Sequence, residues 1–259
     1  MIAMKEMKYM PKFKVSIIPG HGGFDPGAAN SNTKTRECDG NLSVGLKLKQ
    51  LLEFNGFDAV ISRTADIACG GAKTVSQDIT NQINFANKSG ADIAIAIHFN
   101  SSANKTATGT EVLYTNYPTR DENEIRLAKL LLEELVNTTK LRNRGLKETP
   151  SGVGVIKKVK IPCVLSECAF VSNDKESIWC SDEQHNWQLA RAHARAICRY
   201  FGKEYIDLVK INVKLNGKKL SNGYLINDSN YVPVRALCEA FGCTLSWDQN
   251  SKTVNIIKK

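Results

Sequence analysis

Apolar and polar positions alternate along most of the chain with two different periods, which predict strands and helices in turn. Short apolar runs bounded by turn residues predict strands over residues 13–18, 58–62, 92–98, 110–115 and 161–166. Apolar residues spaced three or four apart predict helices over residues 41–55, 74–88, 122–138 and 183–201. Strands that alternate with helices predict an α/β domain, with helices on both faces of a mostly parallel mixed sheet.

The pattern changes in the last part of the chain. Residues 209–259 contain short alternating strands and one short helix, and Asn216-Gly217 is typical of a hairpin turn. We therefore expect a second, small α+β domain there, after a short junction with a first domain at residues 13–204. Residues 1–12 carry lysines but no apolar periodicity, so they are expected to form a flexible leader.

Net charge and apolar content exclude some classes of protein but leave several possible partners. The 35 basic and 26 acidic residues give a net charge of +9, which suits nucleic acid, anionic lipid or anionic cell wall. No nucleic-acid-binding module is recognisable, so we expect no nucleic-acid partner. No apolar run is long enough for a membrane span, and residues 1–14 lack the apolar core of a signal peptide. We expect synthesis in the cytoplasm, without a signal peptide and without membrane insertion.

The cysteines are even in number but show no metal-binding spacing. None of the eight forms a C-x-x-C pair, and several lie in apolar runs, where a thiol acts as a small hydrophobic group. We expect mostly reduced, structural thiols at Cys38, Cys69, Cys163, Cys168, Cys180, Cys198, Cys238 and Cys243.

Four residues with the chemistry of a catalytic metal site lie near predicted strand ends. His21 follows the first strand, His98 ends the central strand, and Glu167 ends the strand at 161–166. Glu37 lies in the loop that leads away from His21. Functional sites of open α/β sheets gather outside the carboxyl ends of the strands, so these side chains are expected to meet.

Two imidazoles and one carboxylate are a common ligand set for catalytic zinc, and a second carboxylate serves as general base. Glu167 suits the second role, and Asp25 or Asn100 suits orienting a ligand or binding substrate. Structural explanations also fit, because a polar residue at a strand end can be a helix cap or part of an ion pair. His185 and His193, on the last predicted helix, are expected to be surface or packing residues.

Several stretches of the first domain together form a specific pattern. Besides Glu37 with Asn41, they are V-S-I-I-P-G-H-G-G-F-D-P-G-A at 15–28, I-S-R-T-A-D at 61–66, A-N-K-S-G-A-D-I-A-I-A-I-H-F-N-S at 86–101, G-T-E-V-L-Y at 109–114, R-G-L-K at 144–147 and I-P-C-V-L-S-E-C-A-F-V-S-N at 161–173. In these stretches the first domain resembles the zinc-dependent N-acetylmuramoyl-L-alanine amidase catalytic domain (the Amidase_3 type).

This resemblance implies a fold, a metal site and a reaction. It implies a mostly parallel six-stranded sheet and one zinc ion held by His21, Glu37 and His98, with Glu167 as the catalytic glutamate. One departure is Gln82, where family members often carry arginine; local substrate contacts or a helix salt bridge are expected to differ there.

The second domain resembles a stalk-like module named after the copper amine oxidase N-terminal domain. No copper is expected, and the module is expected to bind cell wall or to mediate self-association. Tyr231 and Trp247 are suited to stacking on sugars or to a small core, and we favour the core. The matching blocks are V-K-L-N-G-K-K-L at 213–220, Y-V-P-V-R-A-L-C-E-A-F-G-C at 231–243, L-S-W-D at 245–248 and K-T-V-N-I at 252–256.

The resemblance makes hydrolysis of the amide between N-acetylmuramic acid and L-alanine in bacterial peptidoglycan the leading expectation. Arg120, Arg144 and lysines along the cleft are expected to meet carboxylates of the stem peptide. A zinc peptidase that cuts within the stem peptide, and a wall-binding protein without catalysis, are the alternatives. Without a signal peptide, the enzyme is expected to reach the wall after release, as a phage endolysin in preference to a sporulation autolysin.

Overall fold

The computed structural model describes residues 12–115, 122–149, 154–226 and 229–258. Residues 1–11 of the predicted leader, and Arg120, lie outside the described residues. Contacts within the chain divide it into two compact units, Met1–Tyr205 and Ile206–Lys259. The first unit contains every residue proposed above for the chemistry.

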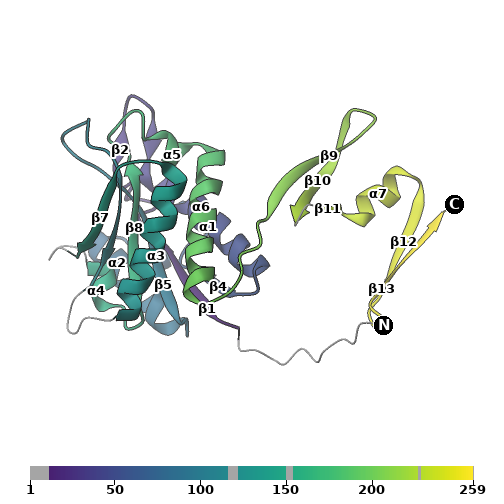
Figure 1. The fold of residues 1–259 in the computed structure, drawn as a ribbon, viewed down its shortest axis with the longest axis horizontal. Helices are drawn as coiled ribbons and strands as arrows, with labels where there is room; N and C mark the ends of the chain where they lie inside the picture. Colours follow the sequence, from purple (N-terminus) through teal and green to yellow (C-terminus); the bar gives the residue numbers. More distant parts are fainter. Residues whose placement is uncertain (1–11, 116–121, 150–153, 227–228, 259) are drawn as a thin grey trace. The chain divides into compact units, whose positions relative to one another are not determined.

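A six-stranded sheet forms the centre of the first unit (Figure 1). Its strand order is β4-β1-β5-β8-β6-β7, and only the β6–β8 pair is antiparallel. The predicted α/β class with a mostly parallel sheet is therefore confirmed. The strands of this sheet are β1 (Lys14–Pro19), β4 (Asp58–Ile61), β5 (Ile93–Asn100), β6 (Thr110–Tyr114), β7 (Asn143–Glu148) and β8 (Cys163–Phe170), and a separate small ribbon pairs β2 (Ala29–Asn30) with β3 (Thr35–Arg36).

Helices cover both faces of this sheet (Figure 1). One face carries α1 (Glu37–Phe54), α3 (Glu122–Thr139) and α6 (Glu183–Tyr200), which pack on one another. The other face carries α2 (Val75–Lys88) and α4 (Gly154–Lys158), whose Ala86, Val155 and Ile156 join one buried cluster with sheet residues. Two shorter elements lie in connections, η1 (Cys69–Gly71) between β4 and α2 and α5 (Ile178–Ser181) between β8 and α6.

Strand alternation decides which helix layer each side chain meets. Ala94 and Ala96 of β5 lie in the apolar cluster beneath α2 and α4, so Ile95 and Ile97 point to the opposite face. His98 continues the alternation of Ala94 and Ala96. His98, near the carboxyl end of β5, therefore lies on the face of the sheet that α2 and α4 cover.

Several elements differ from the sequence-based expectation, among them α1, β7 and α4. Helix α1 begins at Glu37, four residues earlier than predicted, so Glu37 is a helical residue and not a loop residue. Arg36 is the N-cap residue but makes no side-chain capping hydrogen bond. The sequence therefore has no capping residue that would indicate this helix start. Strand β7 was missed because its sequence, N-R-G-L-K-E, has no apolar alternation, and the short helix α4 was missed as well.

The two histidines of α6 have local structural contacts, as predicted. His193 is fully buried; its Nδ1 donates to the Leu189 carbonyl oxygen at 2.7 Å, and its Nε2 accepts from Ser166 Oγ at 2.9 Å. His185 lies in the first turn of the helix, with Nδ1 2.7 Å from the N-cap carboxylate of Asp182. Neither is a member of the His/Glu metal-ligand group found among the described residues.

The second unit contains two small sheets and one helix. The sheets are β9–β10–β11 and the hairpin β12–β13, with bounds β9 (Val209–Leu215), β10 (Lys218–Ile226), β11 (Ser229–Tyr231), α7 (Val234–Ala240), β12 (Cys243–Asp248) and β13 (Thr253–Lys258). Asn216 and Gly217 both have positive φ, so the predicted hairpin turn is confirmed.

The prediction that Tyr231 and Trp247 are core residues of this unit is wrong. Their side chains are 54% and 51% exposed. Trp247 is paired with Val254 across the hairpin β12–β13, and Val254 is exposed too. The apolar face of this two-stranded hairpin is not enclosed by the described residues, which explains the exposure.

All eight cysteines are free thiols, and seven of them are buried. None of the helices in the described part of the chain is long and apolar enough to cross a membrane.

Candidate metal and active site

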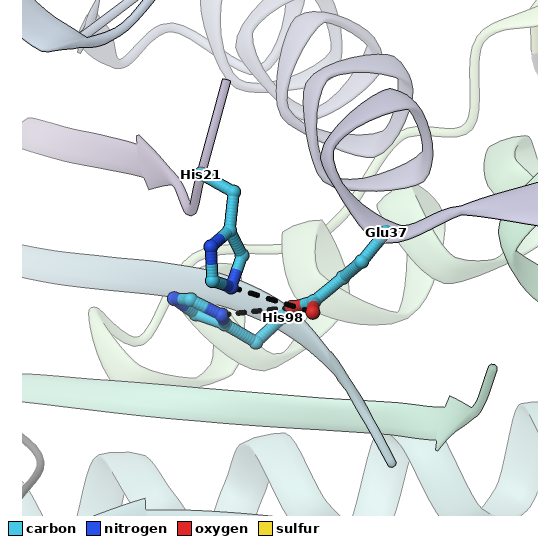
Figure 2. A group of neighbouring side chains, drawn as sticks. All are labelled: His21, Glu37 and His98. Atoms are coloured by element: carbon cyan, nitrogen blue, oxygen red, sulfur yellow. Dashed lines mark hydrogen bonds and ion pairs between the residues drawn. The ribbon is translucent and has the colours of Figure 1, made fainter. Parts of the chain in front are cut away.

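His21, Glu37 and His98 converge from three elements at one edge of the sheet (Figure 2). His21 follows β1, Glu37 is the first residue of α1, and His98 lies in β5. The Glu37 carboxylate lies between the two imidazoles, with Oε2 3.3 Å from His21 Nε2 and Oε1 2.9 Å from His98 Nδ1. One ligand atom from each residue lies within 4.8 Å of the others, which is a geometry that can hold a metal ion.

Two glycines provide the space that this convergence needs. A Cβ atom at Gly20 would lie 2.0 Å from His98 Cε1, and one at Gly27 would lie 2.6 Å from Glu37 Oε2. His21 itself has φ of 60°, a left-handed conformation that is uncommon for a residue with a side chain. The G-H-G-G-F-D-P-G sequence therefore lets the backbone pass close to the two imidazoles and the carboxylate.

Asp25 sets the orientation of His21. Its Oδ2 lies 2.8 Å from His21 Nδ1, and its Oδ1 accepts a hydrogen bond from the Gly27 backbone N–H at 3.0 Å. In the neutral imidazole, a proton on Nδ1 leaves Nε2, which faces Glu37, with the free lone pair that a metal ion needs. A carboxylate behind a histidine is the common outer partner of metal-bound imidazoles.

Glu37 is buried and held as an anion. Burial by itself raises its pKa, but the hydrogen bonds and attraction from His21 and His98 outweigh burial and lower the pKa well below its ordinary value. The backbone N–H groups of Ala28 and Phe99 also donate to it, at 2.9 and 3.2 Å. Burial opposes the charged form of His21, but Glu37 and Asp25 raise its pKa to about 9. The cluster therefore has the negative potential that attracts a cation.

Glu167 lies beside this cluster. It pairs in register with His98 across the parallel strands β5 and β8, and both residues line one cavity of about 170 Å³ together with His21. The walls of this cavity are largely apolar and come from Val75 and Ile79 of α2, Val155 of α4 and Leu165 of β8. Burial, followed by repulsion from Glu37 and Glu111, raises the Glu167 pKa well above its ordinary value. Its Oε2 is buried without a hydrogen-bond partner.

Glu111 is a buried carboxylate of the site that sequence reasoning missed. It lies opposite Glu167 on the antiparallel strand β6. Asn100 Nδ2 donates to its Oε1 and Arg144 Nε donates to its Oε2, each at 2.7 Å. Asn100 and Arg144 thus contact Glu111 and not the His21–Glu37–His98 cluster. The available signal was an acidic residue inside an apolar strand, T-E-V-L-Y, because such a residue is rarely buried without a role or a partner.

A break in strand register turns Arg144 towards Glu111. Asn143 pairs with Thr110 and Gly145 pairs with Glu111, so Arg144 is an extra residue in β7. Gly145 has φ of 83°, which suits such a bulge. The Arg144 guanidinium also lies 4.9 Å from the centre of the Phe170 ring, which fixes its direction further.

Gln82, the position that departs from the family pattern, lines the same cavity as Glu167. Its Nε2 donates to Asp78 Oδ2 at 2.5 Å within α2, and Asp78 Oδ1 accepts from the Cys69 backbone N–H. A hydrogen bond from a neutral amide to this carboxylate therefore stands where an arginine would form an ion pair.

Comparison with known proteins identifies the first unit. Residues 15–199 match the model of the N-acetylmuramoyl-L-alanine amidase family, Amidase_3. The chain belongs to this amidase family. Residues 214–259 match the model of the copper amine oxidase N-terminal domain.

Individual amidases are similar over most of the first unit. N-acetylmuramoyl-L-alanine amidase CwlM of Bacillus licheniformis is 28% identical over 202 residues, which cover 77% of this chain and 74% of CwlM. The germination-specific N-acetylmuramoyl-L-alanine amidase of Bacillus subtilis (strain 168) is 29% identical, over 72% of this chain and 79% of the relative. The crystal structure of N-acetylmuramoyl-L-alanine amidase from Clostridium difficile 630 superposes with a TM-score of 0.66 at 29% identity, covering 74% of this chain and 98% of that one.

Proposed function

We propose that this protein is a zinc-dependent N-acetylmuramoyl-L-alanine amidase that hydrolyses the amide between N-acetylmuramic acid and L-alanine in bacterial peptidoglycan. The observation that carries the proposal is the placement of Glu167 in the same cavity as the His21–Glu37–His98 cluster, within a fold of the amidase family. The substrate is inferred from membership of the family, and the reaction type is inferred from the side chains of the cluster.

The residues present fit a zinc ion. Two imidazole nitrogens and one carboxylate oxygen are a common catalytic donor set, and Asp25 orients one of the imidazoles. The Gly20 and Gly27 positions keep the cluster free of Cβ atoms. We therefore propose His21, Glu37 and His98 as the ligands of one zinc ion, which when bound supplies Lewis acidity towards the scissile carbonyl.

Glu167 moves the protons of the reaction in this proposal. Its unpartnered Oε2 accepts a proton from the attacking water and then delivers that proton to the nitrogen of the leaving stem peptide. A raised pKa suits a group that must hold a proton between these two steps. The apolar walls formed by Ile79, Val155 and Leu165 exclude bulk water from the carboxyl group.

Asn100 and Arg144, which the sequence suggested as substrate contacts, have a different proposed role. Both bind Glu111 and hold it beside Glu167, so they act on the site through Glu111. Asp25, the third suggested residue, is proposed to orient His21 and not to bind substrate.

The test is mass spectrometry of the products released from purified peptidoglycan by the wild type, by EDTA-treated protein and by Glu167→Ala. Intact stem peptides with a free L-alanine amine, lost in both controls and restored by zinc after EDTA, are the expected result. Cuts within the stem peptide would establish the zinc peptidase. Wall binding without any cut would establish a non-catalytic wall-binding protein.

The second unit is proposed to bind cell wall or to mediate self-association, because residues 214–259 match a module distinct from the amidase domain. Deletion of residues 206–259, followed by sedimentation with intact walls and by light scattering, separates these two roles. The preference for a phage endolysin over a sporulation autolysin stays a prediction.

A further inference from the structure

A second cavity opens at the carboxyl end of the sheet, outside the catalytic pocket. Its volume is about 520 Å³, and three loops form it, at residues 29–32, 105–108 and 172–175. Almost all of its lining side chains are polar or charged. It shares no lining residue with the pocket of His98 and Glu167, and no role proposed above uses it.

Side-chain hydrogen bonds tie the three loops together. Asn30 Nδ2 donates to the Val171 carbonyl oxygen and to Asp174 Oδ1, each at 2.9 Å. Asn173 Nδ2 donates to the Ala107 carbonyl oxygen at 3.0 Å. The Ser102 backbone N–H donates to Ser172 Oγ at 3.0 Å. The cavity is therefore held in shape by the fold, which reduces the ordering cost of binding.

Glu176, just behind the cavity, provides a further anchor. This buried carboxylate accepts hydrogen bonds from the backbone N–H groups of Gly109 and Phe170, at 3.0 and 2.9 Å, and from the Thr108 hydroxyl. It fixes the loop that carries Lys105 and Thr108 against the end of β8. The backbone of the loop that carries Lys105 is thus held by a buried network, while the Lys105 and Lys175 side chains are exposed.

The charge of the lining favours an anionic ligand. Lys105 and Lys175 contribute two positive charges and Asp174 one negative charge, which leaves a balance of +1. Both oxygens of Asp174 already accept hydrogen bonds from the amides of Asn30 and Asn32. No aromatic ring on which a sugar could stack lines this cavity within the described residues. Ammonium groups with neighbouring amides and hydroxyls are suited to carboxylates.

The cavity lies next to the metal-site residues along the chain. Ala29, in its wall, directly follows Ala28, whose backbone N–H donates to Glu37 Oε2. Ser172 and Asn173, which also line the cavity, follow the end of the strand that carries Glu167. Two of the loops that line the cavity are therefore continuous in sequence with backbone of the catalytic site, at Ala28 and at the end of β8.

We propose that this cavity is the stem-peptide subsite, in which Lys105 and Lys175 bind the free carboxylates of the peptide released by the reaction. The inference rests on the proposed amidase function, because that function defines the stem peptide as the leaving group. It makes the enzyme selective for stem peptides whose carboxylates are not amidated.

Binding of a product peptide tests the subsite without requiring catalysis. Isothermal titration calorimetry at low salt compares the tripeptide L-alanyl-γ-D-glutamyl-L-lysine with the same peptide carrying amides at both carboxyl groups. The wild type is expected to bind the free acid more tightly. Lys105→Gln/Lys175→Gln is expected to weaken binding of the free acid about tenfold and to leave the diamide unchanged, because two charge-assisted contacts are lost.

A matched variant controls for net charge. Lys12→Gln/Lys129→Gln removes the same charge from exposed positions outside the cavity and is expected to bind the free acid as the wild type does. Equal affinity of Lys105→Gln/Lys175→Gln and wild type for the free acid would overturn the proposal. The proposal would also be overturned if Lys105→Gln/Lys175→Gln lost binding of an N-acetylglucosamine tetramer but kept binding of the peptide. That result would identify the cavity as a glycan subsite. Peptide binding by a wild type that does not cleave peptidoglycan would refute the amidase function alone.

Discussion

Glu111 and Glu167 lie directly opposite each other on the antiparallel strands β6 and β8. Opposed residues of an antiparallel pair share one face of the sheet, so two carboxyl groups lie side by side in a buried environment. Arg144 and Asn100 bind Glu111 and stabilise its charge, whereas Glu167 Oε2 has no hydrogen-bond partner. The pair is therefore unequal: burial, followed by repulsion from Glu37 and then from Glu111, raises the pKa of Glu167.

Replacing Glu111 with glutamine is expected to move the pH profile of the reaction. Loss of the negative charge lowers the pKa of Glu167, so the limb of kcat/KM that reports ionisation of Glu167 shifts to lower pH, by up to about one unit. Arg144→Gln removes the positive charge that offsets Glu111 and is expected to shift the same limb upward. Shifts in the same direction for both variants, or a change in thermal stability alone, would contradict this coupling.

Substitution of Gly27 by alanine is expected to disrupt the metal site. The added Cβ would lie 2.6 Å from Glu37 Oε2 and 2.7 Å from the His21 ring, and φ of 65° adds backbone strain. We expect zinc content and peptidoglycan hydrolysis to fall at least tenfold in Gly27→Ala. The measurements are metal analysis of the purified protein and turbidity loss of a wall suspension.

Gly202→Ala is the matched control for this substitution. Gly202 has the same φ of 65°, but nothing lies within 4 Å of the added Cβ. It is expected to lose about 1 kcal/mol of stability from backbone strain while keeping zinc and activity. Similar zinc loss in both variants would show that strain, and not contact with the ligands, is responsible.

The convergence of His21, Glu37 and His98 was the most predictable part of this site. His98 and Glu167 were expected near the ends of two buried strands, and the structure pairs them in register. Both strands extend past these residues, β5 to Asn100 and β8 to Phe170. The register shifts after His98, but Asn100 and Phe170 still pair with each other. The family resemblance, and not the spacing, singled out Glu37 as a ligand, since a carboxylate 16 residues after His21 has no local signature.

Contacts between distant segments account for what the sequence did not reveal. The link from Arg144 to Glu111 depends on the register of β6 with β7 and on a bulge. The link from Asn100 to Glu111 joins β5 to β6 across the strand β8 between them, and no local pattern indicates either link. The sequence likewise could not decide whether Asp25 orients a ligand or binds substrate, because its contact with His21 appears only in the structure. Trp247 was expected in a core because tryptophan is usually buried, but a two-stranded hairpin has too little chain to enclose it.

Removal of the Asp25 carboxylate is expected to weaken zinc binding without unfolding the protein. Asp25 holds His21 with its Nε2 towards Glu37, and loss of such an outer partner typically costs 10- to 100-fold in metal affinity, so we expect about that factor for Asp25→Ala. Competition with a chromophoric chelator measures the affinity. Asp39→Ala, which removes an exposed carboxylate of α1 paired with Arg36, should leave zinc affinity unchanged. An unchanged affinity in Asp25→Ala would refute the orienting role.

Buried His193 is expected to make the protein less stable in mild acid. Burial lowers its pKa to about 4, from the ordinary 6.5, so the unfolded chain binds a proton there at pH values where the folded chain does not. Stability therefore falls as pH drops from about 6.5 to about 4, by up to about 3 kcal/mol from this residue. His193→Gln removes this titration, and its urea unfolding free energy is expected to fall less than that of the wild type between pH 7 and pH 4.5. His185→Gln, on the same helix but partly exposed, should keep the wild-type slope; equal slopes in all three proteins would show that His193 is not the acid-sensitive group.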